Sequence, residues 1–81
     1  MVDKLRVGIV GAGRWAQKAH LPGFQRSPIC ETVAICDLNL ELAEKVAKQF
    51  QIPDVYKNYE NLLNRADIDV IDICTRASPD D

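Results

Sequence analysis

The feature that most constrains this chain is a glycine-rich turn near its N-terminus, in the sequence RVGIVGAGRWAQKAH at residues 6–20. A short apolar run ends there in the pattern G-x-G-x-x-A, and a helix-like segment follows. Gly11 allows a sharp turn from strand to helix, Gly13 leaves the backbone open to close approach, and Ala16 lets the helix pack near the strand. The first helical turn then offers free N–H groups to an anion. The pattern predicts either a phosphate-binding turn or a purely steric strand-to-helix turn.

Four segments have the character of strands. Leu5–Val10 and Thr32–Cys36 are nearly continuous apolar runs, as in strands that are covered on both faces. Ile68–Cys74 alternates more, because two aspartates interrupt it, and Asp54–Tyr56 is expected to be a short strand.

Three segments are expected to be helical. Arg14–Arg26 has helical apolar spacing, although Pro22 and Gly23 should kink or end its first part. Asn39–Phe50 is the clearest helix, with one apolar stripe, and Asn58–Arg65 is a shorter one. Each of these two begins with an asparagine that we expect to cap it.

On the last of these helices, Leu62 and Leu63 are expected to face the core. The alternation of strands and helices predicts an α/β fold with a parallel sheet, right-handed crossovers and helices on both faces.

An acidic residue, Asp37, follows the second strand and stands 21 positions after Ala16. A carboxylate there is placed to accept hydrogen bonds from the adenosine ribose of a dinucleotide.

Asp37 also separates the two nicotinamide cofactors. A carboxylate at this position would repel the additional phosphate of NADP, and neither Leu38 nor Asn39 is a cation. The sequence therefore favours NAD over NADP. The alternative for Asp37 is a capping role at the start of the next helix.

With these residues in view, the sequence resembles the glucose–fructose oxidoreductase and inositol 2-dehydrogenase family of NAD(P)-dependent oxidoreductases. The resemblance runs almost end to end, through RVGIVGAGRWAQKAHLPGF, VAICDLNLELAEKVAKQF, VYKNYENLL and DIDVIDICT. It implies a partial Rossmann fold over residues 1–76, with sheet order 3-2-1-4. The polar sequence ASPDD at 77–81 is expected to be a loose tail.

The resemblance also implies which residues contact the cofactor. The pyrophosphate would lie against the turn and the backbone of the two residues after it, the ribose on the Asp37 carboxylate, and Thr75 would line the crevice at the end of the last strand. The implied cofactor-binding set is Gly11, Ala12, Gly13, Arg14, Trp15, Asp37 and Thr75.

The sequence departs from the family in two ways. Arg76 stands where the family usually has proline, and its guanidinium either reaches a phosphate or projects into solvent. The family's Glu-Lys-Pro segment and its substrate domain do not occur in these 81 residues, so no catalytic residue is expected here. The outer edge of the last strand would then be an exposed apolar edge that favours self-association.

Several residues admit a structural reading beside a functional one. Trp15 either covers the cofactor or packs half-exposed on the first helical turn. His20 is expected to pack near the helix kink rather than to act as a base, since no carboxylate is close to it in sequence. Cys36 and Cys74 are expected to be small buried hydrophobes.

Composition excludes other classes of function. The net charge is −2 with no basic cluster, and no apolar run approaches membrane-spanning length, so nucleic acid and membrane are not expected partners. Three scattered cysteines and a single histidine give no metal pattern. With no signal peptide recognised, a reducing, cytoplasmic location is expected.

Three functions remain open from the sequence. The first is the NAD-binding part of an oxidoreductase that acts on a sugar, polyol or related secondary alcohol, inactive by itself. The second is a stand-alone NAD-sensing module without catalysis. The third is a fragment that binds S-adenosylmethionine, whose ribose an acidic residue can also hold.

Overall fold

The computed structural model describes residues 4–13 and 16–74. Its four strands are β1 (Leu5–Val10), β2 (Cys30–Cys36), β3 (Asp54–Tyr56) and β4 (Val70–Ile73). All pairings are parallel, and the order in the sheet is β3-β2-β1-β4. The expected α/β class and the 3-2-1-4 order are both confirmed.

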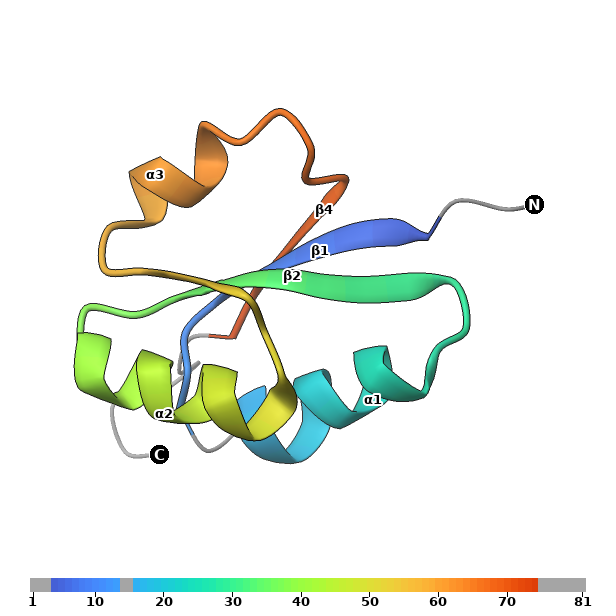
Figure 1. The fold of residues 1–81 in the computed structure, drawn as a ribbon, viewed down its shortest axis with the longest axis horizontal. Coiled ribbons are helices and arrows are strands. Elements are labelled where there is room, and N and C mark those ends of the chain that lie inside the picture. The colour runs from blue at the N-terminus through green and yellow to red at the C-terminus, as the bar shows by residue number, and fades with distance from the viewer. Residues whose placement is uncertain (1–3, 14–15, 75–81) are drawn as a thin grey trace.

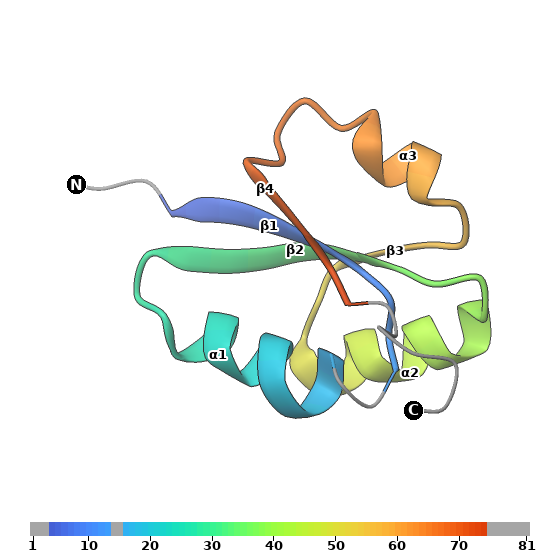
Figure 2. The same cartoon turned by 180° about the vertical axis from the view of Figure 1, so that it is seen from behind.

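The helices lie on both sides of this sheet. They are a π-helix η1 (Ala16–His20) and the α-helices α1 (Leu21–Arg26), α2 (Leu40–Phe50) and α3 (Tyr59–Leu63). Figures 1 and 2 show α1 and α2 together on one face of the sheet and α3 alone on the other.

The helix that follows the glycine turn has two parts, as expected from Pro22 and Gly23. Its first part, η1, ends at His20. Pro22 then lies in the first turn of α1, where a helix does not require its N–H. The helical path then continues to Arg26.

The two asparagine caps behave differently. The Asn39 side chain accepts a hydrogen bond from the N–H of Leu42 at 3.2 Å, as expected for the cap of α2. Asn58 precedes α3 without a side-chain capping bond. On α3, Leu62 is fully buried but Leu63 is 50% exposed, so the expectation for Leu63 is wrong. Successive helical positions lie about 100° apart, and this five-residue helix buries only one face.

Two apolar layers hold the sheet between its helices. The layer beneath α1 and α2 is the larger, and its fully buried members include Val7, Ile9, Leu21 and Ile35. The layer beneath α3 is built from Val33, Ala34, Cys36 and Leu62. A register shift between β1 and β2 places one additional β2 residue opposite β1 at Val7/Gly8, which explains why neighbours Val33 and Ala34 pack in the same layer.

A cluster of ionic groups joins the end of α3 to the amino-terminal edge of the sheet. Arg65 donates to Asp67 at 2.6 and 2.9 Å and to Asp54 at 2.7 Å. Arg6 on β1 donates to Asp67 at 3.0 Å. We call Arg6, Asp54, Arg65 and Asp67 the Arg65 cluster. The hydrogen bonds from Arg65 lower the pKa of Asp67 from 3.8 to about 2.

This lowered pKa predicts a pH-dependent contribution to stability. The contribution is fully present above about pH 3.8, where Asp67 is ionised in both the folded and unfolded states, and is lost as the pH falls toward about 2. The difference in stability between the wild type and Asp67→Asn should therefore be largest near neutral pH and shrink between pH 4 and 2. Urea unfolding of both proteins across that range measures it, and a difference independent of pH would contradict the prediction.

Candidate functional site

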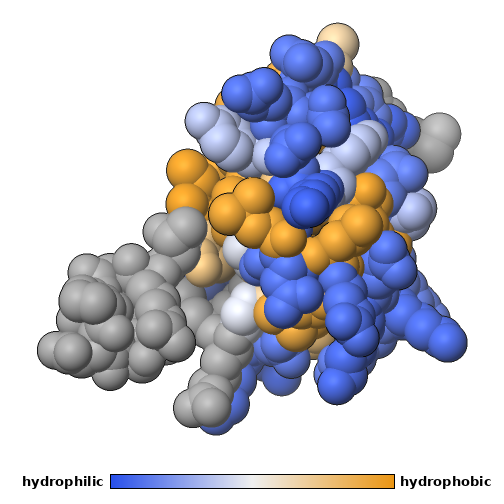
Figure 3. Space-filling model, turned by 90° about the vertical axis from the view of Figure 1, so that its left-hand side faces the viewer, coloured by the Kyte–Doolittle hydropathy of each residue, from blue (hydrophilic) through white to orange (hydrophobic). Residues whose placement is uncertain are grey.

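A cleft opens at the carboxyl ends of β1, β2 and β3. Its volume is about 540 Å³. Figure 3 shows apolar atoms gathered across the middle of the face that presents these strand ends, with hydrophilic side chains above and below them. The cleft is lined by Val10, Gly11, Cys36, Asp37, Leu38, Lys57, Asn58, Tyr59 and Glu60.

Gly11 makes the turn out of β1, and only glycine suits its position. Its φ is +103°, a conformation that residues with a Cβ rarely adopt. A Cβ added there would lie 2.8 Å from the carbonyl oxygen of Cys74. The N–H of Gly11 donates to the carbonyl of Cys36 at 2.7 Å, which fixes the turn against the end of β2.

The next two residues of the turn have opposite surroundings. Ala12 is fully buried, and its N–H points toward β2. At Gly13 no heavy atom of residues 4–13 and 16–74 lies within 4 Å of the position that a Cβ would take. The backbone at Gly13 is therefore open on the side that a side chain would otherwise occupy.

The Asp37 carboxylate connects the turn to α2. One oxygen accepts from the N–H of Ala12 at 2.8 Å, and the other accepts from the N–H of Asn39 at 2.8 Å. Asp37 therefore also has part of the helix-capping role that was its alternative, because it supports Asn39, the residue that caps α2. Each carboxylate oxygen can accept more than one hydrogen bond, so Asp37 retains capacity for a ligand hydroxyl.

Of the cofactor-binding residues expected from the sequence, Gly11 and Asp37 line the cleft, and Ala12 and Gly13 complete the turn beside it. Arg14, Trp15 and Thr75 lie outside the described residues, as do Arg76 and the tail at 77–81.

The wall of the cleft beyond β3 was missed by the sequence reasoning. It is formed by Lys57, Asn58, Tyr59 and Glu60, and Leu38, from the segment after β2, lines the same cleft. Leu38 is 77% exposed and Tyr59 is 55% exposed, so two large side chains with apolar surface border the cleft. The parallel topology predicted from the sequence could have indicated this wall, because residues that follow parallel strands gather at one edge of a sheet.

A second cluster of polar side chains consists of His20, Asp72 and Cys74, which do not line the cleft. His20 Nδ1 and Asp72 of β4 form a hydrogen-bonded pair, and the Cys74 thiol donates to the same carboxylate at 3.5 Å. The expected packing role of His20 therefore includes a carboxylate partner, 52 positions away in sequence. Burial, followed by the Asp72 charge, raises the pKa of Cys74 to about 12.

Cys36, the last residue of β2, lines the cleft. Burial and the neighbouring Asp37 charge raise the pKa of its thiol as well. Both cysteines are buried, as expected for small hydrophobic residues, and neither is primed as a thiolate nucleophile.

The parallel sheet, the glycine turn and the acidic residue after β2 define a Rossmann-type dinucleotide-binding domain. The family model described as an oxidoreductase family with an NAD-binding Rossmann fold matches residues 5–81. The chain belongs to this family, and the resemblance seen in its sequence is confirmed.

Curated relatives include enzymes that act on sugars. D-glucoside 3-dehydrogenase of Escherichia coli K12 is 32% identical over 71 residues, covering 88% of this chain and 20% of that protein. A dTDP-3,4-didehydro-2,6-dideoxy-α-D-glucose 3-reductase of Streptomyces violaceoruber is 35% identical over 70 residues, covering 86% of this chain and 20% of that protein. The chain thus spans about a fifth of the length of these relatives.

Solved structures of similar proteins contain nicotinamide cofactors. A 3-ketoreductase from Actinomadura kijaniata in complex with NADP has a TM-score of 0.86 at 26% identity, over 95% of this chain and 24% of that one. An oxidoreductase from Agrobacterium radiobacter in complex with NAD+, L-tartaric acid and magnesium has a TM-score of 0.83 at 25% identity, over 90% of this chain and 21% of that one.

In the part of the chain that the structure describes, no helix has the length and apolar character needed to cross a lipid bilayer.

Proposed function

We propose that the glycine turn and Asp37 together bind the ADP-ribose part of NAD. The pyrophosphate lies against the open backbone at Gly13, and the ribose hydroxyls donate to the Asp37 carboxylate. The adenine enters the cleft between Leu38 and Tyr59, whose exposed surfaces suit a flat, apolar ring. In this proposal, Trp15 and the backbone of Arg14 contact the pyrophosphate, and Thr75 lines the crevice at the end of β4.

One observation carries the proposal. The hydrogen bond from Ala12 N–H to Asp37 brings the residue that would recognise the ribose into direct contact with the turn that would hold the pyrophosphate. These two parts of a dinucleotide are covalently adjacent, so their binding groups must also be adjacent. A steric strand-to-helix turn has no need of a carboxylate at this point.

Asp37 supports NAD as the preferred cofactor. Its charge opposes a phosphate on the adenosine ribose, whereas a free 2′-hydroxyl donates to it. Calorimetric titration with NAD, NADP and S-adenosylmethionine tests the assignment. We expect NAD to bind more tightly than NADP, and binding of S-adenosylmethionine without NAD would overturn the proposal.

The reaction that this cofactor serves is proposed from the family. Hydride passes between C4 of the nicotinamide and the carbinol carbon of a secondary alcohol in a sugar, polyol or related compound, while the hydroxyl proton leaves to a base. The 81-residue chain supplies cofactor binding and no acid–base group for this step. A dehydrogenase assay of the chain with sugars and polyols should show no turnover, and robust turnover would contradict this division of roles.

A reducing, cytoplasmic setting fits the three cysteines, all of which are free thiols. We propose no nucleic-acid or membrane partner, in keeping with a net charge of −2 and mixed charge along the chain.

We propose that two copies of this chain associate through β4. This strand is at the edge of the described sheet, and Val70, Ile71 and Ile73 are 38%, 36% and 63% exposed. The free edge of a strand offers unpaired N–H and C=O groups to another strand, and these side chains add apolar surface to the contact.

A lysine on this edge is expected to weaken the association. Ile73→Lys should shift the 81-residue chain toward monomer at concentrations where the wild type self-associates, because the charge would be desolvated in the contact. Leu63→Lys is the matched control, since Leu63 is 50% exposed but lies on α3. Light scattering over a concentration series measures both, and a wild type that stays monomeric throughout would contradict the proposal.

A further inference from the structure

Lys57 emerges beside Asp37 at the cofactor edge of the sheet. Cys36 and Tyr56 are register partners at the ends of β2 and β3, so the next residues, Asp37 and Lys57, leave neighbouring strands side by side. Such strands are about 4.8 Å apart, and the four-carbon stem of lysine easily spans this distance.

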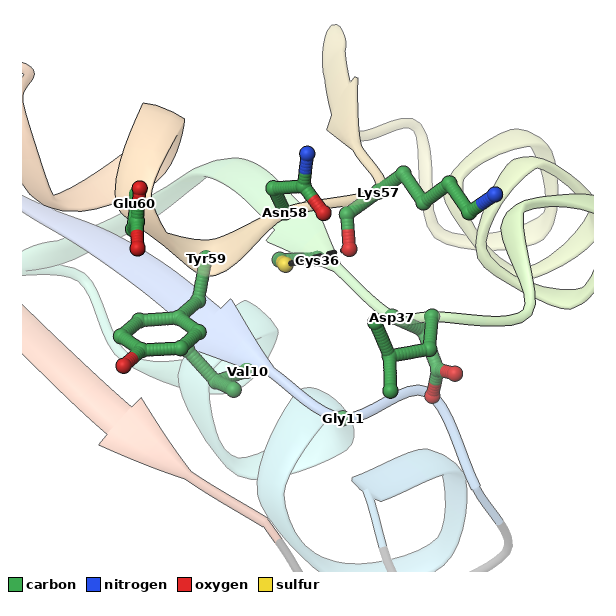
Figure 4. A pocket seen from close by; sticks show the side chains of 9 residues that line it. Val10, Gly11, Cys36, Asp37, Lys57, Asn58, Tyr59 and Glu60 are labelled. Carbon is green, nitrogen blue, oxygen red and sulfur yellow. Dashed lines mark hydrogen bonds between the residues drawn. The ribbon is translucent and has the colours of Figure 1, made fainter.

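Two backbone contacts fix this neighbourhood. The N–H of Asp37 donates to the carbonyl of Tyr56 at 3.1 Å, and the Cys36 thiol donates to the carbonyl of Lys57 at 3.5 Å. Both residues line the same cleft, and Figure 4 shows the Lys57 side chain extending along the side of the cleft on which Asp37 lies.

The Lys57 ammonium forms no ion pair with a carboxylate of the described residues. Within residues 4–13 and 16–74, the ion pairs of the structure involve Arg6, His20 and Arg65 but not Lys57. Asp37 receives its two hydrogen bonds from backbone N–H groups. The other carboxylate of the cleft, Glu60, lies beyond Tyr59 and away from the Lys57 ammonium (Figure 4).

We propose that Lys57 is a specificity-determining residue that admits NADP to this site as a second cofactor. Its ammonium binds the 2′-phosphate of the adenosine ribose and offsets the repulsion from Asp37. The inference rests on the proposed binding of NAD and extends it. The cation comes from the segment after β3, 20 positions beyond Asp37, and not from the residues directly after β2.

Lys57 therefore strengthens the binding of NADP but not that of NAD. The 2′-hydroxyl of NAD carries no charge, so removal of the ammonium leaves NAD binding nearly unchanged. NADP loses a charge-assisted contact in a partly solvated site, which corresponds to a loss of about fivefold to tenfold in affinity at low salt. NAD remains the tighter ligand, because Asp37 is retained.

The test is a calorimetric titration of NAD and NADP into the wild type, Lys57→Gln and Lys57→Glu at low ionic strength. We expect Lys57→Gln to weaken NADP by about fivefold to tenfold and NAD by less than about twofold, with a larger NADP loss for Lys57→Glu. Lys48→Gln is the matched control, because Lys48 is exposed on α2 and outside the cleft. It should change neither affinity.

The outcomes separate this inference from the proposed function. NAD binding to the wild type with no detectable NADP binding would overturn the role of Lys57 and leave the proposed function intact. NADP binding that is insensitive to both Lys57 substitutions, or equal weakening of NAD and NADP, would also overturn it. Failure of NAD itself to bind the wild type would overturn the proposed function, and the inference with it.

Discussion

Asp37→Ala is expected to weaken NAD binding to the 81-residue chain by about a hundredfold or more. The carboxylate is the proposed acceptor for the ribose hydroxyls, and hydrogen bonds to a charged group contribute about 1.5–3 kcal/mol each. Two such bonds would be lost, together with the contact that holds the N–H of Ala12 toward β2. Calorimetric titration measures the change.

Two further variants separate ribose binding from helix capping. Asp37→Asn keeps the shape but removes the charge, and we expect an intermediate loss of NAD affinity. Asn39→Ala removes the cap of α2, with an expected loss of about 1 kcal/mol in stability and little change in NAD affinity. If Asp37→Ala bound NAD as tightly as the wild type, Asp37 would have only a structural role.

Substitution of the two glycines of the turn should affect different properties: Gly11→Ala should lower stability, and Gly13→Ala should lower NAD affinity. Gly11→Ala is expected to lower the free energy of unfolding by about 2–4 kcal/mol, because alanine at a φ of +103° is strained and its Cβ would approach the Cys74 carbonyl at 2.8 Å. Such a loss is a large part of the stability of a domain this small.

Gly13→Ala serves as the matched variant. Among the residues that the structure describes, no atom lies within 4 Å of the added Cβ, so thermal unfolding should change little. The methyl group would instead occupy the space where the pyrophosphate is proposed to lie, and NAD affinity should fall by about tenfold or more. Unaltered stability of Gly11→Ala would refute the strain argument, and undiminished NAD binding by Gly13→Ala would refute the placement of the pyrophosphate.

The sheet could be predicted from the sequence because its signals are local. Leu5–Val10 and Asp54–Tyr56 match the observed strands, and the order of elements determines the parallel topology. Boundaries that depend on pairing were less accurate. The second strand begins at Cys30 rather than Thr32, because pairing with β1 extends it beyond its apolar run.

The features that sequence reasoning missed depend on contacts between distant residues. The His20–Asp72 pair joins η1 to β4, and the Arg65 cluster joins β1, β3 and the segment after α3. No local pattern marks such pairs. The wall of the cleft beyond β3 was missed for a related reason, since Lys57 and Tyr59 acquire a role only once β3 lies beside β2.

The most direct test of the central claim, that the turn and Asp37 form one dinucleotide site, is a ¹H–¹⁵N NMR titration of the 81-residue chain with NAD. We expect saturable shifts of the backbone amides of Gly11, Ala12, Asp37 and Tyr59. The amide of Arg65, at the opposite edge of the sheet, should remain unchanged. An absence of shifts at the turn and at Asp37 with millimolar NAD, or shifts confined to the Arg65 cluster, would contradict the account.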